Sequence, residues 1–332
     1  MQGCSLVRVT ESSQRGEARR CASTWAARLD FGEERAGRVA IVATELASNL
    51  LKHAPQGGQL FVGPVADHGN VGISIVAVDA GPGIADERQA LEDGHSTAGS
   101  AGTGLGAVRR LSDLFELYSP RDHGTIVVSR LWREPGKGSA QVSVAGVCGM
   151  MDGESVSGDD FAIMDHDGLT RIVLADGLGH GPGAAEAAHE AIRVFEQSAT
   201  QSLGGVLATM HARLRPTRGA AVALAEIDPV SRTLRYAGLG NISGLMGTRG
   251  NLRNLISHNG TVGHTARKIQ EFDYELPAAA AVILHSDGIT TRWNLDGYPG
   301  LLSCDPVVTA AVLYRDFNRG RDDATAVVAK VP

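Results

Sequence analysis

Cysteine is scarce in this sequence, and the four cysteines are not arranged as a metal site. Cys4, Cys21, Cys148 and Cys304 lie far apart, with no CxxC pair and no Cys/His cluster at zinc spacing. This spacing excludes the common zinc-binding patterns. We expect the four thiols to be reduced and mostly buried.

Long apolar runs and an excess of basic residues are also missing. No segment reaches the ~18 apolar residues of a membrane-spanning helix, and the N-terminus has no apolar stretch of signal-peptide length. The formal net charge is −6, whereas nucleic-acid partners favour basic surfaces. We expect a cytoplasmic protein with neither a membrane nor a nucleic acid among its partners.

The composition is that of an ordinary globular protein with more than one domain. The chain has 332 residues, of which 43% are hydrophobic and 20% charged, and it is long for a single core. Residues 133–140 combine Pro, Gly, Ser and charge, which suits an exposed connector. We predict an N-terminal domain over residues 1–134, a linker over 135–141 and a C-terminal domain over 142–332.

The first part of the chain has the pattern of an α/β domain. Apolar residues recur at helical spacing over 18–29 and 33–53. Strand-like runs follow, and a glycine-rich stretch precedes a third helix. The predicted strands are 59–65, 71–78, 115–118 and 125–131, and the third helix is 107–113.

Polar residues form one line on the helix predicted over 33–53. Glu45, Asn49 and Lys52 are about one turn apart, so they can project from one face, although a solvated surface stripe has the same pattern.

Two glycine-rich segments follow this helix. The first, DAGPGI at 79–84, places a carboxylate at a strand end, where it can accept a hydrogen bond from a base amino group; alone it could be a turn. The second, GTGLG at 102–106, opens a helix whose N-terminus favours phosphate.

Two other nucleotide folds are excluded by what is absent from these segments. There is no GxxxxGK[ST] motif, and no βαβ unit with an early strand precedes the glycines. Neither a P-loop nor a dinucleotide-binding fold is therefore indicated.

In order, ELASNLLKHA, DAGPGI, GTGLG and a final Gly124-Thr125 resemble the N, G1 and G2 boxes of the GHKL (Bergerat-type) ATPases, over about residues 10–132. Within that family the segment is most similar to the serine kinases and switch proteins of the anti-sigma and stressosome group. The resemblance implies an α/β sandwich that binds ATP and Mg²⁺, with Asn49 on the Mg²⁺ and Asp79 on the adenine. We assign Glu45 as general base, because a carboxylate one turn before a metal ligand can take a proton; a purely structural role is the alternative. The other cofactor-binding residues that the resemblance implies are Gly81, Gly83, Gly102, Thr103, Gly104, Leu105, Gly106 and Thr125.

The C-terminal part contains many short strand patterns and few helices. Antiparallel strands with a few long helices predict a β-sandwich flanked by helices. The predicted strands are 142–147, 161–164, 171–175, 220–227, 233–238, 281–284 and 324–328, with helices near 183–198 and 204–214.

Four acidic motifs flank or end apolar strands in this part. They are SGDD at 157–160, DGLGHG at 176–181, SDG at 286–288 and RDDAT at 321–325. A single Asp-Gly is most often a turn. Buried aspartates, however, must be paired or metal-bound, so several that converge from strand ends indicate a hard-cation site with oxygen ligands.

These motifs, together with RYAGLGNISG, resemble the 2C-type (PPM) metal-dependent protein serine/threonine phosphatases, over about residues 142–330. The match is to the bacterial branch typified by the stage II sporulation phosphatase. The resemblance implies two Mn²⁺ or Mg²⁺ ions that activate a water, so that no protein nucleophile is needed. The implied metal ligands are Asp176, which bridges both ions and is catalytic, the Gly177 carbonyl, Asp159, Asp287 and Asp322, with Asp160 and Asp323 in support.

Two further features of this motif set concern substrate binding. His180 could protonate the leaving oxygen, or it could orient the loop or lie near the phosphate. The arginine with which eukaryotic members grip the substrate phosphate has no obvious counterpart before Gly158.

Together the two resemblances imply a bacterial partner-switching enzyme. A phosphatase that acts on small phosphorylated switch proteins, of the STAS antagonist type, is fused to an ATP-dependent serine kinase-like domain. In one alternative the ATP domain binds a sigma factor or antagonist without catalysis. In another the whole chain is a scaffold. A homodimer is compatible with either domain, although no assembly signal stands out.

Overall fold

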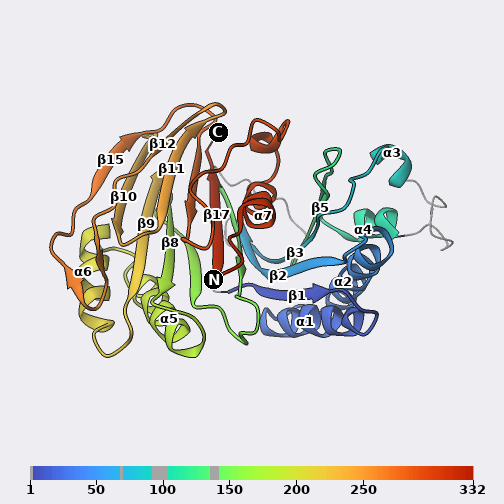
Figure 1. Cartoon of the computed structure of the whole chain (residues 1–332), viewed down its shortest axis with the longest axis horizontal. Helices are drawn as coiled ribbons and strands as arrows, with labels where there is room; N and C mark the ends of the chain where they lie inside the picture. Colours follow the sequence, from blue (N-terminus) through green and yellow to red (C-terminus); the bar gives the residue numbers. More distant parts are fainter. Residues whose placement is uncertain (1–2, 68–69, 92–103, 135–141, 332) are drawn as a thin grey trace. The chain divides into compact units, whose positions relative to one another are not determined.

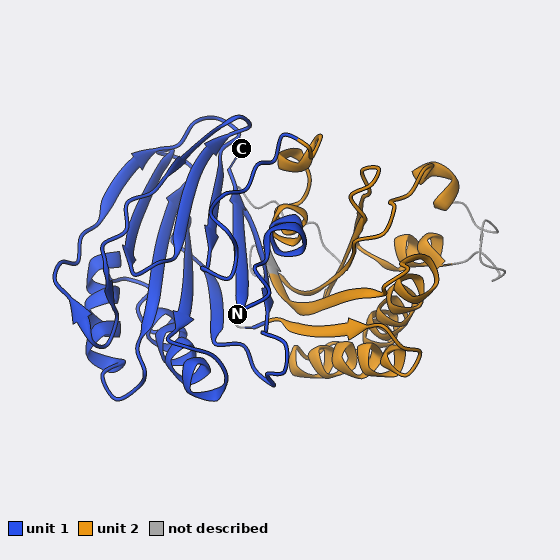
Figure 2. Cartoon of the chain, in the orientation of Figure 1, with its two compact units in different colours: residues 1–3, 140–296, 312–332 blue, residues 4–139, 297–311 orange. Residues whose placement is uncertain are grey.

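The computed structural model describes residues 3–67, 70–91, 104–134 and 142–331. The predicted linker at 135–141, Gly102 and Thr103 lie outside the described residues. The chain divides into two compact units, which Figure 2 distinguishes by colour. Unit 1 comprises Met1–Gly3, Ala140–Asp296 and Val312–Pro332, and unit 2 comprises Cys4–Ser139 and Gly297–Ala311.

Unit 2 contains a five-stranded antiparallel sheet with the order β1-β2-β3-β5-β4. Its longer helices lie on one face of that sheet (Figure 1). The strands are β1 (Ser5–Val9), β2 (Gly58–Asp67), β3 (Asn70–Asp79), β4 (Leu114–Tyr118) and β5 (Thr125–Trp132). The helices are α1 (Gln14–Arg28), α2 (Glu33–His53), α3 (Glu87–Ala90) and α4 (Gly104–Leu111).

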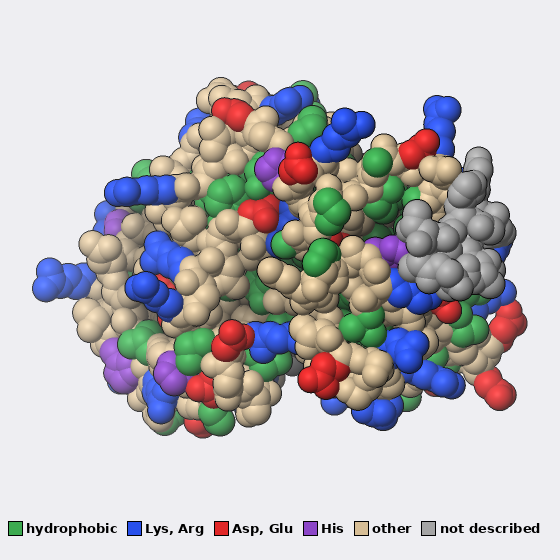
Figure 3. Space-filling model, turned by 45° about the vertical axis from the view of Figure 1, so that its right-hand side comes forward, with side chains coloured by type: hydrophobic (Ala, Val, Ile, Leu, Met, Phe, Trp, Pro, Cys, Tyr) green, Lys and Arg blue, Asp and Glu red, His purple; other side chains and the backbone are tan. Residues whose placement is uncertain are grey.

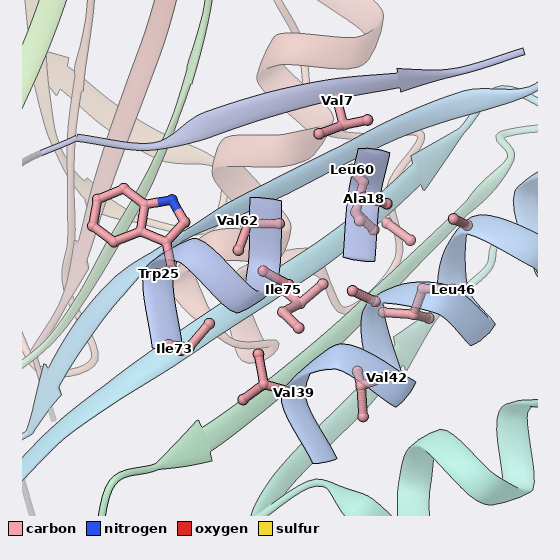
Figure 4. Packing of buried hydrophobic residues seen from close by; sticks show 14 of the residues in the cluster. Val7, Ala18, Trp25, Val39, Val42, Leu46, Leu60, Val62, Ile73 and Ile75 are labelled. Carbon is pink, nitrogen blue, oxygen red and sulfur yellow. The ribbon is translucent and has the colours of Figure 1, made fainter. Parts of the chain in front are cut away.

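The core of unit 2 lies between these helices and the sheet. Val39, Val42 and Leu46 recur at helical spacing on α2 and are fully buried, which is the pattern of an amphipathic helix. Ile73 and Ile75 alternate along β3 and point to the same side, as successive side chains of a strand alternate between faces. Figure 4 shows these side chains meeting between the two layers.

Helix boundaries in unit 2 follow local hydrogen bonds. The prediction of 33–53 agrees with α2, but α1 begins four residues before its predicted start at 18. The Gln14 side chain accepts hydrogen bonds from the backbone N–H groups of Thr10 (2.6 Å) and Glu11 (2.7 Å), which fixes the chain where the helix begins. Among the described residues, helix α4 spans Gly104–Leu111, so Leu105 and Gly106 are helical rather than part of a preceding loop.

Unit 1 contains two five-stranded antiparallel sheets, with the orders β15-β10-β9-β8-β7 and β12-β11-β16-β17-β6. Helices α5 (Pro182–Glu196) and α6 (Leu203–Arg213) cover the first sheet and share a buried apolar core with it (Figure 1). This arrangement confirms the predicted sandwich flanked by helices. The strands are β6 (Ser143–Gly149), β7 (Asp159–His166), β8 (Leu169–Gly177), β9 (Ala220–Asp228), β10 (Thr233–Leu239), β11 (Ser243–Thr248), β12 (Asn251–Asn254), β13 (Gly260–Thr261), β14 (Thr265–Ala266), β15 (Phe272–Glu275), β16 (Ala281–His285) and β17 (Ala324–Lys330).

The sequence analysis missed the helices α3 and α7 (Pro306–Phe317) and the strands β1, β11, β12, β13, β14 and β15. Helix α7 is apolar at nearly every position up to Tyr314, so it lacks the polar stripe that marks a surface helix. The missed strands are short, and β11 contains two glycines, which weaken a strand pattern.

The described residues show neither a membrane-spanning helix nor, on the face shown in Figure 3, a separation of charges of opposite sign. Among the described residues, no helix is both long and apolar enough to cross a membrane. On the face shown in Figure 3, acidic and basic side chains of the described residues are interspersed.

Candidate functional site

The predicted adenine-binding carboxylate, Asp79, lies at the end of β3 directly opposite Thr125 of β5. Its Oδ1 atom accepts hydrogen bonds from the backbone N–H of Gly81 (2.8 Å) and of Thr125 (3.3 Å). The carboxylate is therefore fixed by the turn that follows it and by the neighbouring strand. The structure thus brings Asp79, Gly81 and Thr125 together, as predicted.

Two glycines near Asp79 have backbone conformations that L side chains rarely adopt. Gly83 has φ +80° and Gly124 has φ +70°, and a Cβ on Gly124 would collide with the carbonyl oxygen of Asp79. Ser119, which the sequence analysis did not identify, links these segments. Its Oγ accepts a hydrogen bond from Ile84 N–H (2.7 Å) and shares one with Thr125 Oγ1 (3.0 Å).

Asn49 of α2 faces the start of α4. A Cβ on Gly104 would lie 2.8 Å from Asn49 Oδ1, so the absence of a side chain at 104 lets the two helices approach. Asn49 Nδ2 is buried and has no hydrogen-bond partner among the described residues. Since a buried amide without a partner costs free energy, this arrangement fits a polar ligand. Glu45 lies one turn earlier on α2 and is half-buried.

The aspartates of unit 1 come from both sheets. Asp159 begins β7 and lies directly opposite Asp176 of β8. Asp287 follows the end of β16, and Asp322 precedes β17, the neighbour of β16 in the second sheet. Strand order places Asp159 beside Asp176 in one sheet and Asp287 and Asp322 at neighbouring strands of the other. The effect of Asp287 and Asp322 on the pKa of Asp176 shows that the two pairs lie near each other.

The pKa values show that these carboxylates repel one another. Burial raises the pKa of Asp176 to about 9, and the negative charges of Asp159, Asp287 and Asp322 add to the effect. Burial likewise raises the pKa of Asp159 to about 7. For Asp287 the direction is also upward, because burial and Asp322 outweigh the opposing charge of Arg319. A cation between such groups would remove this repulsion.

The hydrogen bonds divide the aspartates into two groups. Asp323 accepts from Met151 N–H (2.8 Å) and Gly158 N–H (2.7 Å) through its two oxygens, so it fixes loops rather than offering a free ligand atom. Asp160 Oδ1 accepts from the N–H of Phe161 (2.8 Å). Asp159 Oδ2, in contrast, is buried with no donor in hydrogen-bond geometry among the described residues, although the Ser286 and Thr325 hydroxyls are near enough to the carboxylate to oppose the rise in its pKa.

This orphaned oxygen fits a divalent cation, which prefers carboxylate and carbonyl ligands. In the described part of the chain, however, no three Asp, Glu, His or Cys side chains are already close enough together to hold a metal ion. The structure thus brings the predicted ligands into mutual electrostatic range without forming a closed ligand shell.

Neighbouring polar groups orient this acidic site. Asn241 Nδ2 donates a hydrogen bond to Asp287 Oδ2 (2.6 Å). His180 Nδ1 lies 2.5 Å from Glu154 Oε1 at the edge of the loop that follows Asp176. Neither Asn241 nor Glu154 was identified from the sequence. Asn241 does lie within the quoted RYAGLGNISG motif, which was the available signal.

Two family models match different parts of the chain. Residues 166–332 match the family model "Stage II sporulation protein E (SpoIIE)", and residues 9–131 match "Histidine kinase-like ATPase domain". The chain is 39% identical over 132 residues to the serine/threonine-protein kinase RsbT of Bacillus subtilis (strain 168). That match covers 40% of this chain and 98% of RsbT.

Two solved structures are similar to this one. A structure described for the bacterial stressosome, a modular system adapted to control secondary messenger signaling, has 26% identity and a TM-score of 0.52. It covers 57% of this chain and 98% of its own. The structure of RsbX in complex with magnesium has 17% identity and a TM-score of 0.51, and covers 66% of this chain and 100% of its own. The RsbX likeness shows a shared fold.

Proposed function

Because this chain belongs to the stage II sporulation protein E family and also carries an RsbT-like histidine kinase-like ATPase domain, we propose that its two sites set the phosphorylation state of a small switch protein in opposite directions. The C-terminal part is a PP2C-type, metal-dependent protein serine/threonine phosphatase, and it is fused to an ATP-binding kinase-like domain. This is the organisation of a partner-switching regulator.

At the phosphatase site we propose that Asp159, Asp176, Asp287 and Asp322, with the Gly177 carbonyl, hold two Mn²⁺ or Mg²⁺ ions. When bound, the ions would supply positive charge for the phosphate and lower the pKa of the attacking water. The buried Asp159 Oδ2 atom without a hydrogen-bond donor supports this assignment most directly.

The chain's own groups have distinct tasks at this site. The carboxylates bind cations only in their deprotonated form. Their raised pKa values favour the protonated form in the metal-free protein, so cation binding would release protons. Asn241 orients Asp287 through its amide hydrogen bond. Asp323 holds the Gly158 loop next to Asp159. His180, oriented by Glu154, could donate a proton to the leaving serine oxygen.

At the ATP site we propose that Asp79 and Thr125 bind the adenine, Asn49 binds Mg²⁺, and Glu45 takes the proton of the substrate hydroxyl. The glycines around 81–83 and 102–106 would let the backbone approach the nucleotide. The buried, unpaired Asn49 amide supports a ligand at this position. Phosphoryl transfer demands mainly positioning and charge neutralisation, which such a pocket can provide.

The partner that we propose is a STAS-type antagonist or a similar switch protein, or a sigma factor bound by the ATP domain. Its serine or threonine would be phosphorylated at one site and dephosphorylated at the other. None of the four cysteines, all in the described part of the chain, forms a disulfide. This agrees with a reducing compartment, and we place both reactions in the cytoplasm.

Hydrolysis of a phosphoserine peptide and of p-nitrophenyl phosphate by the purified chain tests the phosphatase assignment. We expect hydrolysis that requires Mn²⁺ or Mg²⁺. Asp176→Asn should lose more than the roughly 10- to 100-fold that is typical of residues behind metal ligands. Asp167→Asn, at an exposed turn of the same unit, is the matched control and should keep full activity. Hydrolysis without a divalent cation, or an active Asp176→Asn protein, would contradict the proposal.

A further inference from the structure

The proposed cations would supply positive charge for the substrate phosphate, but they do not by themselves fix its orientation. A guanidinium near the site could do so, because it presents parallel N–H donors to two phosphate oxygens. The sequence analysis found no arginine before Gly158 that could grip the phosphate. The structure places one elsewhere, at Arg218, in the loop between α6 and β9.

The backbone around Arg218 is fixed to the loop that follows Asp176. Gly219, with φ +78°, accepts a hydrogen bond at its carbonyl oxygen from the N–H of Leu178 (2.9 Å). On the other side, Thr217 Oγ1 accepts from Gly219 N–H (3.0 Å) and donates to Leu214 O (2.7 Å). Arg218 is therefore held between two anchored residues, two positions away from the strand pair that contains Asp176.

The side chain of Arg218 lies across the same loop. A Cβ on Gly183 would lie 2.7 Å from Nε of Arg218, and a Cβ on Gly179 would lie 3.4 Å from its Nη1. Gly183 is in the first turn of α5, where glycine is a poor helix former. The space beside Gly183 is filled by the guanidinium, which gives a physical reason for glycine at this position.

The loop that the guanidinium contacts also lies against Gly158, the residue before Asp159. A Cβ on Gly158 would lie 3.3 Å from the carbonyl oxygen of Gly179 and 2.9 Å from Asp323 Oδ2. Gly179 is thus close both to the guanidinium of Arg218 and to the Gly158 segment that Asp323 holds. Among the described residues the guanidinium makes one hydrogen bond, from Nη1 to His180 O (3.4 Å), and no ion pair. Most of its five N–H donors remain available, and its side chain is exposed.

We propose that Arg218 binds the phosphate of the substrate phosphoserine or phosphothreonine at the phosphatase site. The proposal rests on the proposed phosphatase function and adds the group that positions the substrate. A guanidinium matches two phosphate oxygens with parallel N–H donors, so it fixes orientation as well as charge. The N-terminus of α5, next to Gly183, adds a weaker attraction for the same anion.

Arg319 is the rival candidate, because its charge opposes the rise in the pKa of Asp287 and so acts at the same site. Its backbone N–H is bonded to Gly288 O (2.8 Å), in the loop after Asp287. Arg218 is favoured because its guanidinium lies against Gly179 and Gly183, in the loop and helix start that follow Asp176. A test must compare both arginines.

Binding of inorganic phosphate to the Mn²⁺-loaded full chain, measured by calorimetry, tests the proposal without requiring turnover. Arg218→Ala should weaken phosphate binding by roughly tenfold or more, since hydrogen bonds to charged groups are worth about 1.5–3 kcal/mol. Arg218→Lys should recover part of the affinity. Arg215→Ala, at an exposed position in the same loop, is the matched control and should bind phosphate like the wild type. Unfolding temperature and Mn²⁺ affinity should be equal in all variants.

The kinetic counterpart is a rise in KM for both p-nitrophenyl phosphate and the phosphoserine peptide, with a smaller change in kcat. Phosphate binding that is unchanged in Arg218→Ala, absent from the wild type, or lost instead in Arg319→Ala would overturn the proposal. So would a KM that rises for the peptide alone, because Arg218 would then contact the peptide and not the phosphate. A wild-type chain that binds phosphate but hydrolyses neither substrate would instead count against the proposed function.

Discussion

At the scale of single residues, the aspartates of unit 1 combine burial with mutual repulsion. Asp159 and Asp176 face each other on neighbouring strands, and burial raises the pKa of both. An unfolded chain would hold these groups in water, with pKa values near 3.8. The folded, metal-free protein therefore binds more protons than the unfolded chain between about pH 4 and pH 9.

This difference predicts how stability depends on pH. Because the folded state holds the extra protons, the free energy of unfolding of the metal-free protein should fall as pH rises from 5 to 8. The largest possible slope is about 1.4 kcal/mol per pH unit for each extra proton. Urea denaturation in EDTA should show this fall in the wild type and a shallower one in Asp176→Asn.

Asp167→Asn serves as the control and should keep the wild-type slope, since this residue is exposed. Added Mn²⁺ should raise the unfolding free energy more at pH 8 than at pH 5, because deprotonated carboxylates bind cations better. Identical pH slopes in the wild type and Asp176→Asn would show that Asp176 does not hold a proton in the folded state.

Motif order predicted that the four Asp motifs come together, and the charges of Asp159, Asp287 and Asp322 do act on Asp176 in the fold. Their role as metal ligands stays a prediction. Asn241, Glu154 and Ser119 could not be predicted in the same way. Each is a polar loop or strand-end residue whose contact depends on the folded positions of distant segments. Arg218 was missed for a related reason, since the glycines beside its guanidinium, Gly179 and Gly183, belong to another segment of the chain.

At the scale of elements, α7 and the residues before it show what sequence patterns miss. Asp305 caps α7, accepting a hydrogen bond at Oδ1 from Val307 N–H (3.0 Å). The same carboxylate pairs with Arg130 of β5 (2.6 Å), and both side chains are almost fully buried. Glu116 of β4 accepts from the N–H of Asp305 (2.8 Å). Within unit 2, the segment Gly297–Ala311 is therefore bound to the last two strands of the sheet.

Breaking this buried pair should be costly. Asp305→Ala leaves the Arg130 guanidinium buried without its partner and removes the cap of α7, so we expect a loss of about 3–5 kcal/mol in unfolding free energy. The double substitution Arg130→Met/Asp305→Leu should recover part of that loss, because no buried charge remains. Urea denaturation measures both effects.

Glu34→Ala is the comparison, since it removes an exposed i,i+4 pair with Arg38 on α2. It should cost about 0.5 kcal/mol or less. Equal effects of Asp305→Ala and Glu34→Ala would show that the buried pair does not stabilise unit 2.

At the scale of the whole molecule, the chain passes between its two units more than once. Gly297–Ala311 groups with Cys4–Ser139, and α7 begins in unit 2 and ends in unit 1. The domain bounds 1–134 and 142–332 remain a prediction about which parts fold independently. The Pro, Gly, Ser and charged residues over 133–140 predicted the linker between them. The contacts of Asp305 with Arg130 and Glu116, in contrast, link positions nearly two hundred residues apart and have no periodic signature.

The same connectivity places both predicted activities in one chain. Asp287 lies before Gly297–Ala311, and Asp322 lies after it, so the strands that present two proposed metal ligands are joined through a segment of unit 2. Kinase and phosphatase sites therefore occur in a fixed ratio of one to one. We propose that they act in opposite directions on the same hydroxyl group.

A labelling experiment tests whether the two sites act on one hydroxyl group. A recombinant STAS-domain antagonist protein is incubated with the full chain, radiolabelled ATP, Mg²⁺ and Mn²⁺, and the phosphoserine or phosphothreonine formed on it is measured. We expect Asp176→Asn to accumulate labelled antagonist, the wild type to accumulate less because it removes the label, and Glu45→Gln to form none. Glu34→Gln, on the same helix as Glu45, should behave like the wild type. Labelling that is equally strong in Glu45→Gln, or absent even in Asp176→Asn, would contradict the account, and the latter would leave the ATP domain as a binding module.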